Sequence, residues 1–232
     1  MQLKFASYNI RKAIGLDRRR DPERILAVLH ELGADVVALQ EADRRFGRRI
    51  SALPRQLVEE HHWQVVPLAT RPDSMGWHGN ALLVRKGIGI VDASPIQLPM
   101  LEPRGAVRAD LEVGGRRVRV VGMHLDLSGL RRRDQLRTIL ADLDACDGAH
   151  PTVMLGDLNE WSQRGGCLRE LDSGWKVLAP GKSFPSRQPV AQLDRIVVSP
   201  EWRCHDTGVH HSALSARGSD HLPVWASLGW ER

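Results

Sequence analysis

Cysteine is scarce in this 232-residue sequence, and the three that occur, Cys146, Cys167 and Cys204, are scattered along the chain. An odd and scattered set argues against a disulfide framework and against a CxxC metal site. No apolar run approaches the length of a membrane span. The first residues lead directly into an expected strand and show none of the regions of a signal peptide. We therefore expect a cytoplasmic protein without a transmembrane segment.

The sequence also lacks internal repeats, low-complexity segments and any recognisable linker between domains. Its hydrophobic content of 42% and charged content of 26% are ordinary for a globular protein. A chain of this length can bury a sizeable hydrophobic core. We expect one domain covering residues 1–232, and nothing in the sequence indicates an oligomeric state.

Apolar residues follow strand and helix periods in different parts of the chain. A helix is expected from the cap Asp21-Pro22 to Gly33, and a second over residues 131–143. Gly114-Gly115 predicts a tight hairpin between two strands. Strands are expected over residues 3–10, 35–40, 63–68, 79–85, 88–91, 106–113, 116–123, 152–155, 193–199 and 222–228. Mixed strands with flanking helices predict an α/β fold in which helices cover two packed sheets.

Polar residues stand at the ends of several expected strands. Asp157 and Asn159 follow the apolar run 151–155, and in extended backbone two such residues point to the same side. Unpaired polar groups in a protein interior are costly, so at the end of a buried strand they usually face a site. Each residue alone is more often a cap or a satisfied hydrogen-bonding group. The other members of the set are Asn9, Glu41, His124, Asp126, Asp194, Asp220 and His221.

Together these residue types suit phosphate chemistry. Oxygen ligands without cysteine pairs favour Mg²⁺ or Mn²⁺. Asparagines can hold a phosphate without repelling it. A histidine beside an aspartate can be oriented and kept protonated, ready to stabilise negative charge that develops on phosphorus oxygens.

The net charge of +5 comes mostly from arginine clusters at residues 18–20, 44–45, 48–49 and 131–133. Basic patches suit phosphate-bearing partners such as nucleic acid or anionic phospholipid. Solvated faces of an arginine-rich chain explain the same clusters equally well.

Seven short motifs follow one another along the chain: Ser7-Tyr8-Asn9-Ile10, Leu39-Gln40-Glu41, Gly79-Asn80-Ala81, His124-Leu125, Gly156-Asp157-Leu158-Asn159, Leu193-Asp194-Arg195-Ile196 and Ser219-Asp220-His221-Leu222-Pro223. In this order they resemble the endonuclease/exonuclease/phosphatase superfamily, which has a deoxyribonuclease I-like fold. Glu102-Pro103-Arg104-Gly105 and Ser183-Phe184-Pro185-Ser186 resemble its small bacterial branch. The resemblance implies a four-layer α/β/β/α sandwich with the site at one edge of the two sheets.

The resemblance also implies roles for individual residues. Glu41 would be the main ligand of Mg²⁺ or Mn²⁺, with Asn9 close to the metal and Asp220 as a further carboxylate on the metal side. Asn80 would line the site, and Arg104 is a plausible phosphate clamp, although an exposed arginine at a strand edge is an equal alternative.

By the same resemblance, Asp157 would position or deprotonate the attacking water, and Asn159 would contact the scissile phosphate. Asp194 would pair with His221, which donates to a phosphate oxygen, while His124 would lie near the phosphate and the leaving group. The implied reaction is in-line attack of water on a phosphoester.

The substrate is the open question. We favour a nuclease-type phosphodiester because of the basic clusters. The alternative is a phospholipid or small-molecule phosphodiesterase or phosphatase, similar to sphingomyelinases or inositol phosphatases. Met75, Trp77 and Trp161 in expected loops near the site motivate that alternative, although they can equally be core residues. An inactive binding module is disfavoured because Glu41 and His221 are both retained.

Overall fold

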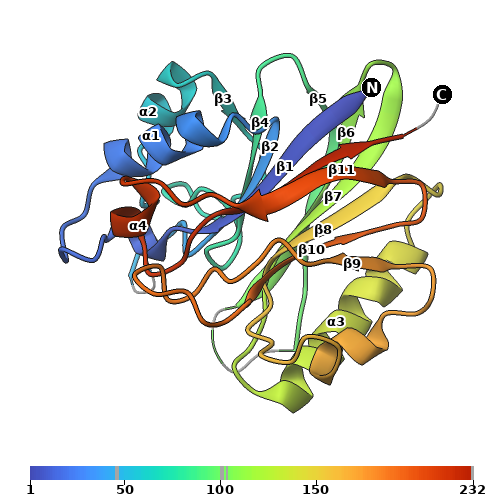
Figure 1. Ribbon diagram of the computed structural model, residues 1–232. Coiled ribbons are helices and arrows are strands. Elements are labelled where there is room, and N and C mark those ends of the chain that lie inside the picture. Colours follow the sequence, from blue (N-terminus) through green and yellow to red (C-terminus); the bar gives the residue numbers. More distant parts are fainter. Residues whose placement is uncertain (45–46, 100–101, 103, 231–232) are drawn as a thin grey trace.

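The computed structural model describes residues 1–44, 47–99, 102 and 104–230. Arg45 and Pro103, which belong to two of the segments noted above, lie outside the described residues. Two mixed six-stranded sheets pack face to face, with helices on their outer sides (Figure 1). The expected α/β sandwich with two packed sheets covered by helices is confirmed.

The first sheet has the strand order β11-β12-β1-β2-β4-β3, and the second has the order β5-β6-β7-β8-β10-β9. The strands of the first sheet are β1 (Gln2–Asn9), β2 (Val36–Gln40), β3 (Trp63–Val65), β4 (Ala81–Arg85), β11 (Arg203–Val209) and β12 (Val224–Gly229). Those of the second sheet are β5 (Gly89–Ile96), β6 (Gly105–Val113), β7 (Arg116–His124), β8 (Thr152–Asp157), β9 (Lys176–Leu178) and β10 (Asp194–Val198).

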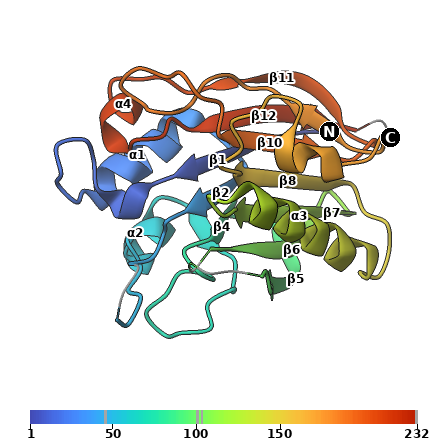
Figure 2. The same ribbon diagram turned by 90° about the horizontal axis from the view of Figure 1, so that it is seen from below.

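Helices α1 (Pro22–Leu32), α2 (Arg55–Glu60) and α4 (Ser215–Gly218) lie on the side of the first sheet, and α3 (Gly129–Asp144) covers the second (Figures 1 and 2). Two 3₁₀ turns, η1 (Arg11–Ala13) and η2 (Gly166–Glu170), complete the elements. Among the described helices, none combines the length and the apolar character that crossing a bilayer needs.

Helix α1 begins and ends where its sequence predicts. The backbone N–H of Arg24 donates to Oδ1 of Asp21 at 2.9 Å, which caps the first turn, and Pro22 occupies the first helical position. Gly33 ends the helix in the left-handed conformation, with φ of 57°. The apolar stripe that includes Ile25 and Leu29 is fully buried against the first sheet.

Edge strands are where the sequence-based prediction was least complete. Strand β5 continues to Ile96, beyond the expected end at residue 91, because an edge strand tolerates Pro95 and polar residues on its unpaired side. Strand β11, also at an edge, was not expected; it is polar, and its pairing with β12 is irregular between Cys204 and Asp206. Helix α2 and the three-residue strand β9 were missed as well.

Strand register brings polar residues of the second sheet into one row. Strands β7 and β8 are parallel, with His124 opposite Asp157, and β8 and β10 are antiparallel, with Asp157 opposite Asp194. In the first sheet, Asn9 at the end of β1 is opposite Gln40 at the end of parallel β2, and Glu41 follows at once. The carboxyl ends of these four parallel-paired strands therefore present their polar residues at the edge where the sheets meet.

Gly156 is required for the tight pairing that brings this row together. A Cβ on Gly156 would lie 1.9 Å from the backbone oxygen of Met123 on the neighbouring strand, and its φ is +158°. We expect Gly156→Ala to lower the free energy of unfolding by about 3 kcal/mol, as measured by urea denaturation. The control Gly115→Ala, where nothing lies within 4 Å, should cost only about 1 kcal/mol for its φ of +75°. Equal losses in the two variants would contradict this assignment.

Candidate active site

The predicted site residues from the two sheets meet at the carboxylate of Asp157. Asn9, at the end of β1, donates from Nδ2 to Oδ2 of Asp157 at 3.1 Å, across 148 positions of sequence. Nε2 of His124 lies 3.4 Å from the same oxygen, and Nε2 of His221 lies 3.7 Å from it. Asp157 is almost completely buried, so these polar and charged groups interact where little water can reach them.

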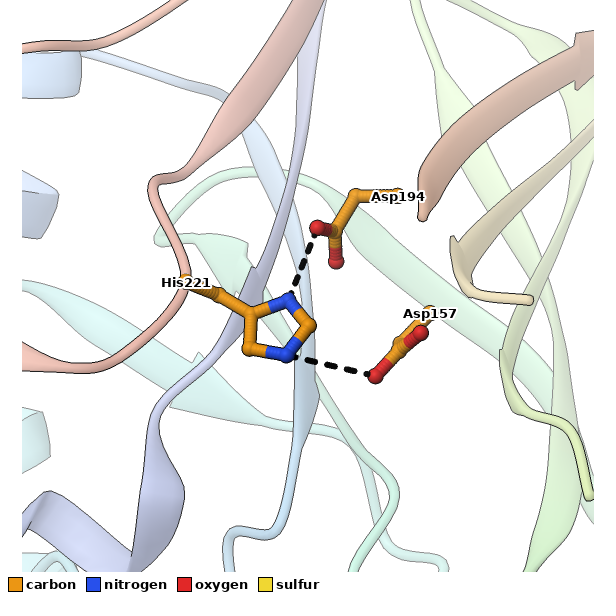
Figure 3. A group of neighbouring side chains, drawn as sticks. All are labelled: Asp157, Asp194 and His221. Carbon is orange, nitrogen blue, oxygen red and sulfur yellow. Dashed lines mark hydrogen bonds and ion pairs between the residues drawn. The ribbon is translucent and has the colours of Figure 1, made fainter. Parts of the chain in front are cut away.

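His221 lies between two carboxylates (Figure 3). Its Nδ1 is 2.9 Å from Oδ2 of Asp194, while Nε2 faces Asp157 on the other side of the ring. The hydroxyl of Ser183 donates to the same Asp194 oxygen at 2.5 Å. The ring of Phe184 packs on the imidazole, with centroids 4.8 Å apart. Segment 183–186, noted in the sequence, therefore fixes both the carboxylate and the ring.

The environment of His221 favours its charged form. Burial by itself would lower the pKa of His221, but the carboxylates of Asp194 and Asp157 outweigh this effect and raise the pKa to about 10. At neutral pH the imidazole carries protons on both nitrogens. Its Nδ1–H therefore donates to Asp194, while its Nε2–H faces Asp157.

His124 is in the opposite state. Burial lowers the pKa of His124 to about 3, Asp157 opposes this and Arg104 adds to it, so the ring is neutral at neutral pH. A guanidinium has only donors, so Nε2 of His124 accepts from Nη1 of Arg104. The same Nη1 donates to the backbone oxygen of Leu125 at 2.9 Å. Arg104, left between two interpretations by the sequence, lies inside the site.

Asn159 lies in a turn after β8, and not in the extended strand that the sequence predicts. Strand β8 ends at Asp157, and Asn159 is left-handed with φ of 50°, so the alternation of side chains along a strand does not apply to it. Its backbone N–H donates to Oδ1 of Asp157 at 3.0 Å, and its Nδ2 donates to the backbone oxygen of Leu125 at 3.0 Å. The turn, rather than the strand, places the backbone N–H of Asn159 on Asp157 and its side chain on the backbone of Leu125.

Glu41 lies at the mouth of a pocket beside this cluster. Its Oε2 contacts Nζ of Lys12, a residue that the sequence analysis did not single out. Lys12 belongs to a run of three left-handed residues, Arg11 to Ala13, with φ between 46° and 59°. No local pattern predicts such a turn, which is why Lys12 was missed.

The remaining predicted residues lie around the same edge. Asp220 is about one-third exposed, and its Oδ2 is 3.5 Å from Nε of Arg11. Asn80 is fully buried and donates from Nδ2 to the backbone oxygen of Gly105 at 3.0 Å, so it ties the loop before β4 to the start of β6. Among the described residues, its Oδ1 has no hydrogen-bond partner.

Other polar residues noted in the sequence have structural roles. Oδ1 of Asp126 accepts from the backbone N–H of Ser128 at 2.8 Å, the bond of a local cap. Arg132 is buried, with Nη2 at 3.3 Å from Oε2 of Glu160, and Arg133 pairs with Glu170 at 2.9 Å. The arginines at 131–133 are thus not one free basic patch, since the helical period turns Arg132 inward.

Met75, Trp77 and Trp161, which the sequence analysis expects in loops near the site, differ in how far they are buried. Met75 is a core residue, and Trp77 packs partly buried against the core between the sheets. Trp161 is 65% exposed, two residues after Asn159. Of the three, Trp161 is the most exposed.

The donor set at Glu41 fits a hard divalent cation. Glu41 already holds a positive charge, the Lys12 ammonium, and oxygen donors of Asn9 and Asp220 stand on neighbouring segments. A few oxygen ligands with room for water suit Mg²⁺ or Mn²⁺. Asp157, Asp194 and His221 also form a compact group, with ligand atoms within 4.8 Å of one another. Within that group Nδ1 of His221 already donates to Asp194, an arrangement that suits proton and hydrogen-bond chemistry.

A family model described as "Endonuclease/Exonuclease/phosphatase family" matches residues 6–221. No curated protein sequence matches the chain at a significant level. Among solved structures, an endonuclease/exonuclease/phosphatase from Bacteroides vulgatus is similar, with a TM-score of 0.78, 16% identity and complete coverage of both chains.

Two further solved structures have described activities or ligands. D. rerio TDP2 in complex with a single-strand DNA product has a TM-score of 0.74 and 16% identity, covering 98% of this chain and 99% of that one. A mannosyl-6-phosphatase from Bacteroides thetaiotaomicron has a TM-score of 0.73 and 18% identity, covering 98% of this chain and all of that one. At these identities the likeness shows the shared fold.

Because the pKa of His221 is raised in the folded protein, we expect the free energy of unfolding to depend on pH. A group whose pKa is about 10 when folded and about 6.5 when unfolded stabilises the fold fully below pH 6.5, and that stabilisation is lost as the pH rises toward 10. With chelator present, the free energy of unfolding should fall between pH 7 and pH 10 by on the order of 2–4 kcal/mol more than in His221→Asn. Urea denaturation at stepped pH measures this difference. Parallel pH profiles for the two proteins would refute the charged state assigned to His221.

Proposed function

The chain belongs to the endonuclease/exonuclease/phosphatase family, and from that premise we propose that it hydrolyses phosphodiester bonds with Mg²⁺ or Mn²⁺, in a nuclease-type substrate. Members of this family are hydrolases that act on phosphate esters. The observation that carries the proposal is the meeting of Asn9, His124 and His221 at the buried carboxylate of Asp157.

Asp157 is the proposed base that positions the attacking water. Asn9 and the backbone N–H of Asn159 hold its two oxygens in place, so the carboxylate has one fixed orientation. A fixed carboxylate beside a water converts its attack on phosphorus into an intramolecular step. Burial excludes bulk water, which would compete for the same position.

His221 is the proposed donor to a phosphate oxygen. Asp194 accepts from Nδ1 and fixes the ring, so that Nε2 carries a proton toward the place where negative charge develops. Asn159 would contact the scissile phosphate. The neutral ring of His124 and the guanidinium of Arg104 would face the phosphate and the leaving group.

Glu41, Asn9 and Asp220 would hold the metal ion. When bound, the ion would neutralise charge on the phosphate as a Lewis acid. Lys12 pairs with Glu41, so the bound ion would share this carboxylate with the Lys12 ammonium or displace it.

Nucleic acid is the favoured substrate. The net charge of +5 supports it, as does the presence of four cationic side chains around the pocket next to Glu41. The similar fold of TDP2, whose structure holds a single-strand DNA product, adds support for a nucleic-acid substrate. We also propose that residues 1–232 form a single domain that acts in the cytoplasm.

Hydrolysis of a phospholipid or of a small phosphorylated molecule is the second candidate. The exposed indole of Trp161 beside Asn159 favours a ligand with an apolar part. The similar fold of a mannosyl-6-phosphatase adds support for a small substrate.

Removing the proposed metal ligand tests the reaction itself. We expect turnover of an aryl phosphodiester, plasmid DNA, single-stranded RNA or phospholipid to require Mg²⁺ or Mn²⁺, and Glu41→Gln to lower kcat at least about 100-fold. The matched control is Glu59→Gln, an exposed glutamate of α2, which should keep full activity. Absence of metal-dependent turnover on every substrate would overturn the proposal, and the preferred substrate decides between the two candidates.

Asp194→Asn tests the orientation of His221. The amide cannot stabilise the imidazolium as the carboxylate does, so we expect kcat to fall by about 100-fold or more with KM little changed. The variant's pH profile should also shift, since the pKa of His221 loses its strongest support. An unchanged kcat would remove His221 from the proposed chemistry.

A further inference from the structure

A pocket adjoins the proposed catalytic cluster and extends away from it. It has about 450 Å³ of empty space, including the part open to solvent, and Glu41 and His124 form the wall it shares with the cluster. Four cationic side chains, those of Lys12, Arg44, Arg49 and Arg104, also line it. The carboxylates on its walls are Glu41 and Asp43.

Both carboxylates make their hydrogen bonds and closest ion pair with groups other than Arg44 and Arg49. Glu41 is bound to Lys12. Asp43 is buried, and its oxygens accept from Oγ of Ser74 at 2.5 Å and from the backbone N–H of Met75 at 2.8 Å. Burial raises the pKa of Asp43, and the bonds from Met75 and Ser74, with a smaller electrostatic effect of Arg49, oppose that shift. Within the described residues, Arg44 and Arg49 therefore have no hydrogen-bonded carboxylate partner.

Arg49 is held in place without losing its charge. Its Nη1 is 3.1 Å from Nδ1 of His78, which must accept because a guanidinium has only donors. Burial, with smaller effects of Arg49 and Arg71, lowers the pKa of His78 to about 4, so the ring is neutral at neutral pH. A neutral acceptor fixes the guanidinium on the wall and leaves its positive charge for a ligand.

The backbone around Arg44 is ordered by pairing. The N–H of Arg44 donates to the backbone oxygen of Ile50 at 2.9 Å, and Asp43 forms a bridge with Ser51. These bonds join the backbone at Arg44 to that just after Arg49, and both side chains line the pocket. Each guanidinium presents its N–H donors in a planar fork that matches two phosphate oxygens, so two such side chains lining one pocket suit a phosphate group.

We propose that this pocket binds a second phosphate group of the substrate, one carried near the phosphate that is cleaved. The proposal rests on the proposed function, and it names Arg44 and Arg49 as residues that determine specificity. Arg104 links the two phosphate positions, because it contacts His124 in the cluster and also lines the pocket. The second phosphate is either the next one along a nucleic-acid strand or a further phosphate on a small molecule.

Substrate pairs that differ only in the second phosphate test the idea. One pair is a thymidine dinucleotide with and without a 5′-phosphate, and the other is a sugar phosphate with and without an added phosphate. With Mg²⁺, we expect kcat/KM of the wild-type protein to be about 10-fold or more higher for the phosphorylated member of one pair. The pair that shows the preference identifies the source of the phosphate.

Variants then locate the preference in the pocket. Arg44→Ala/Arg49→Ala should reduce the ratio of kcat/KM within the pair to about 2 or less, and Arg44→Lys/Arg49→Lys should give an intermediate ratio. The matched control Arg55→Ala/Arg117→Ala removes the same charge from two exposed positions outside the pocket and should keep the wild-type ratio. The lysine variant also serves if the alanine variant does not fold.

The outcomes separate this inference from the proposed function. Equal cleavage of both members of each pair by the wild-type protein would overturn the second-phosphate pocket and leave the phosphodiesterase assignment standing. A preference that persists in both the alanine and the lysine variants would also overturn it. Lack of turnover on all members by a protein that does hydrolyse the aryl phosphodiester or plasmid DNA would overturn the inference alone, and lack of turnover on those substrates as well would overturn the proposed function with it.

Discussion

The arrangement of the site depends on one buried carboxylate, that of Asp157. Its two oxygens take hydrogen bonds from Asn9 in the first sheet and from the turn that carries Asn159, and they face both histidines. A buried charge is tolerated only when it is paired and hydrogen-bonded. The contacts that stabilise the buried charge of Asp157 therefore also tie the two sheets together at this edge. They also hold the two imidazoles in different protonation states.

Backbone strain gathers at the same edge. Arg11, Lys12, Ala13, Glu41, His78 and Asn159 are all left-handed, although none is glycine. Each such residue costs on the order of 1 kcal/mol, and the strain persists only where the surrounding structure fixes the conformation. Here three fully buried clusters, one between the sheets and one beneath the helices on each side, supply that constraint. The strained turns place Lys12 and Glu41 on one pocket and the backbone N–H of Asn159 on Asp157, positions that regular strands alone would not give.

Much of the fold and of the site was predictable from the sequence. Helix α1 and the central strands have strong local signals, because capping residues and apolar periodicity report buried elements directly. The edge strands β5 and β11 were mispredicted or missed, since an element with one solvated side has no need for apolar residues. Asn9, Asp157, Asp194 and His221 were found because each stands next to a buried strand. Asp126 shared that position but proved to be a cap.

The sequence by itself determined which residue types stand at the strand ends and which family the motifs resemble, because strand ends and motifs are local features. Tertiary structure alone decided that His221 is charged and His124 neutral, since their pKa values depend on carboxylates and burial supplied by other strands. It also decided that Lys12 reaches Glu41, that Arg132 turns inward, and that Arg44 and Arg49 face one pocket. Such contacts follow from sheet register and from left-handed turns, and neither leaves a periodic signal in the chain.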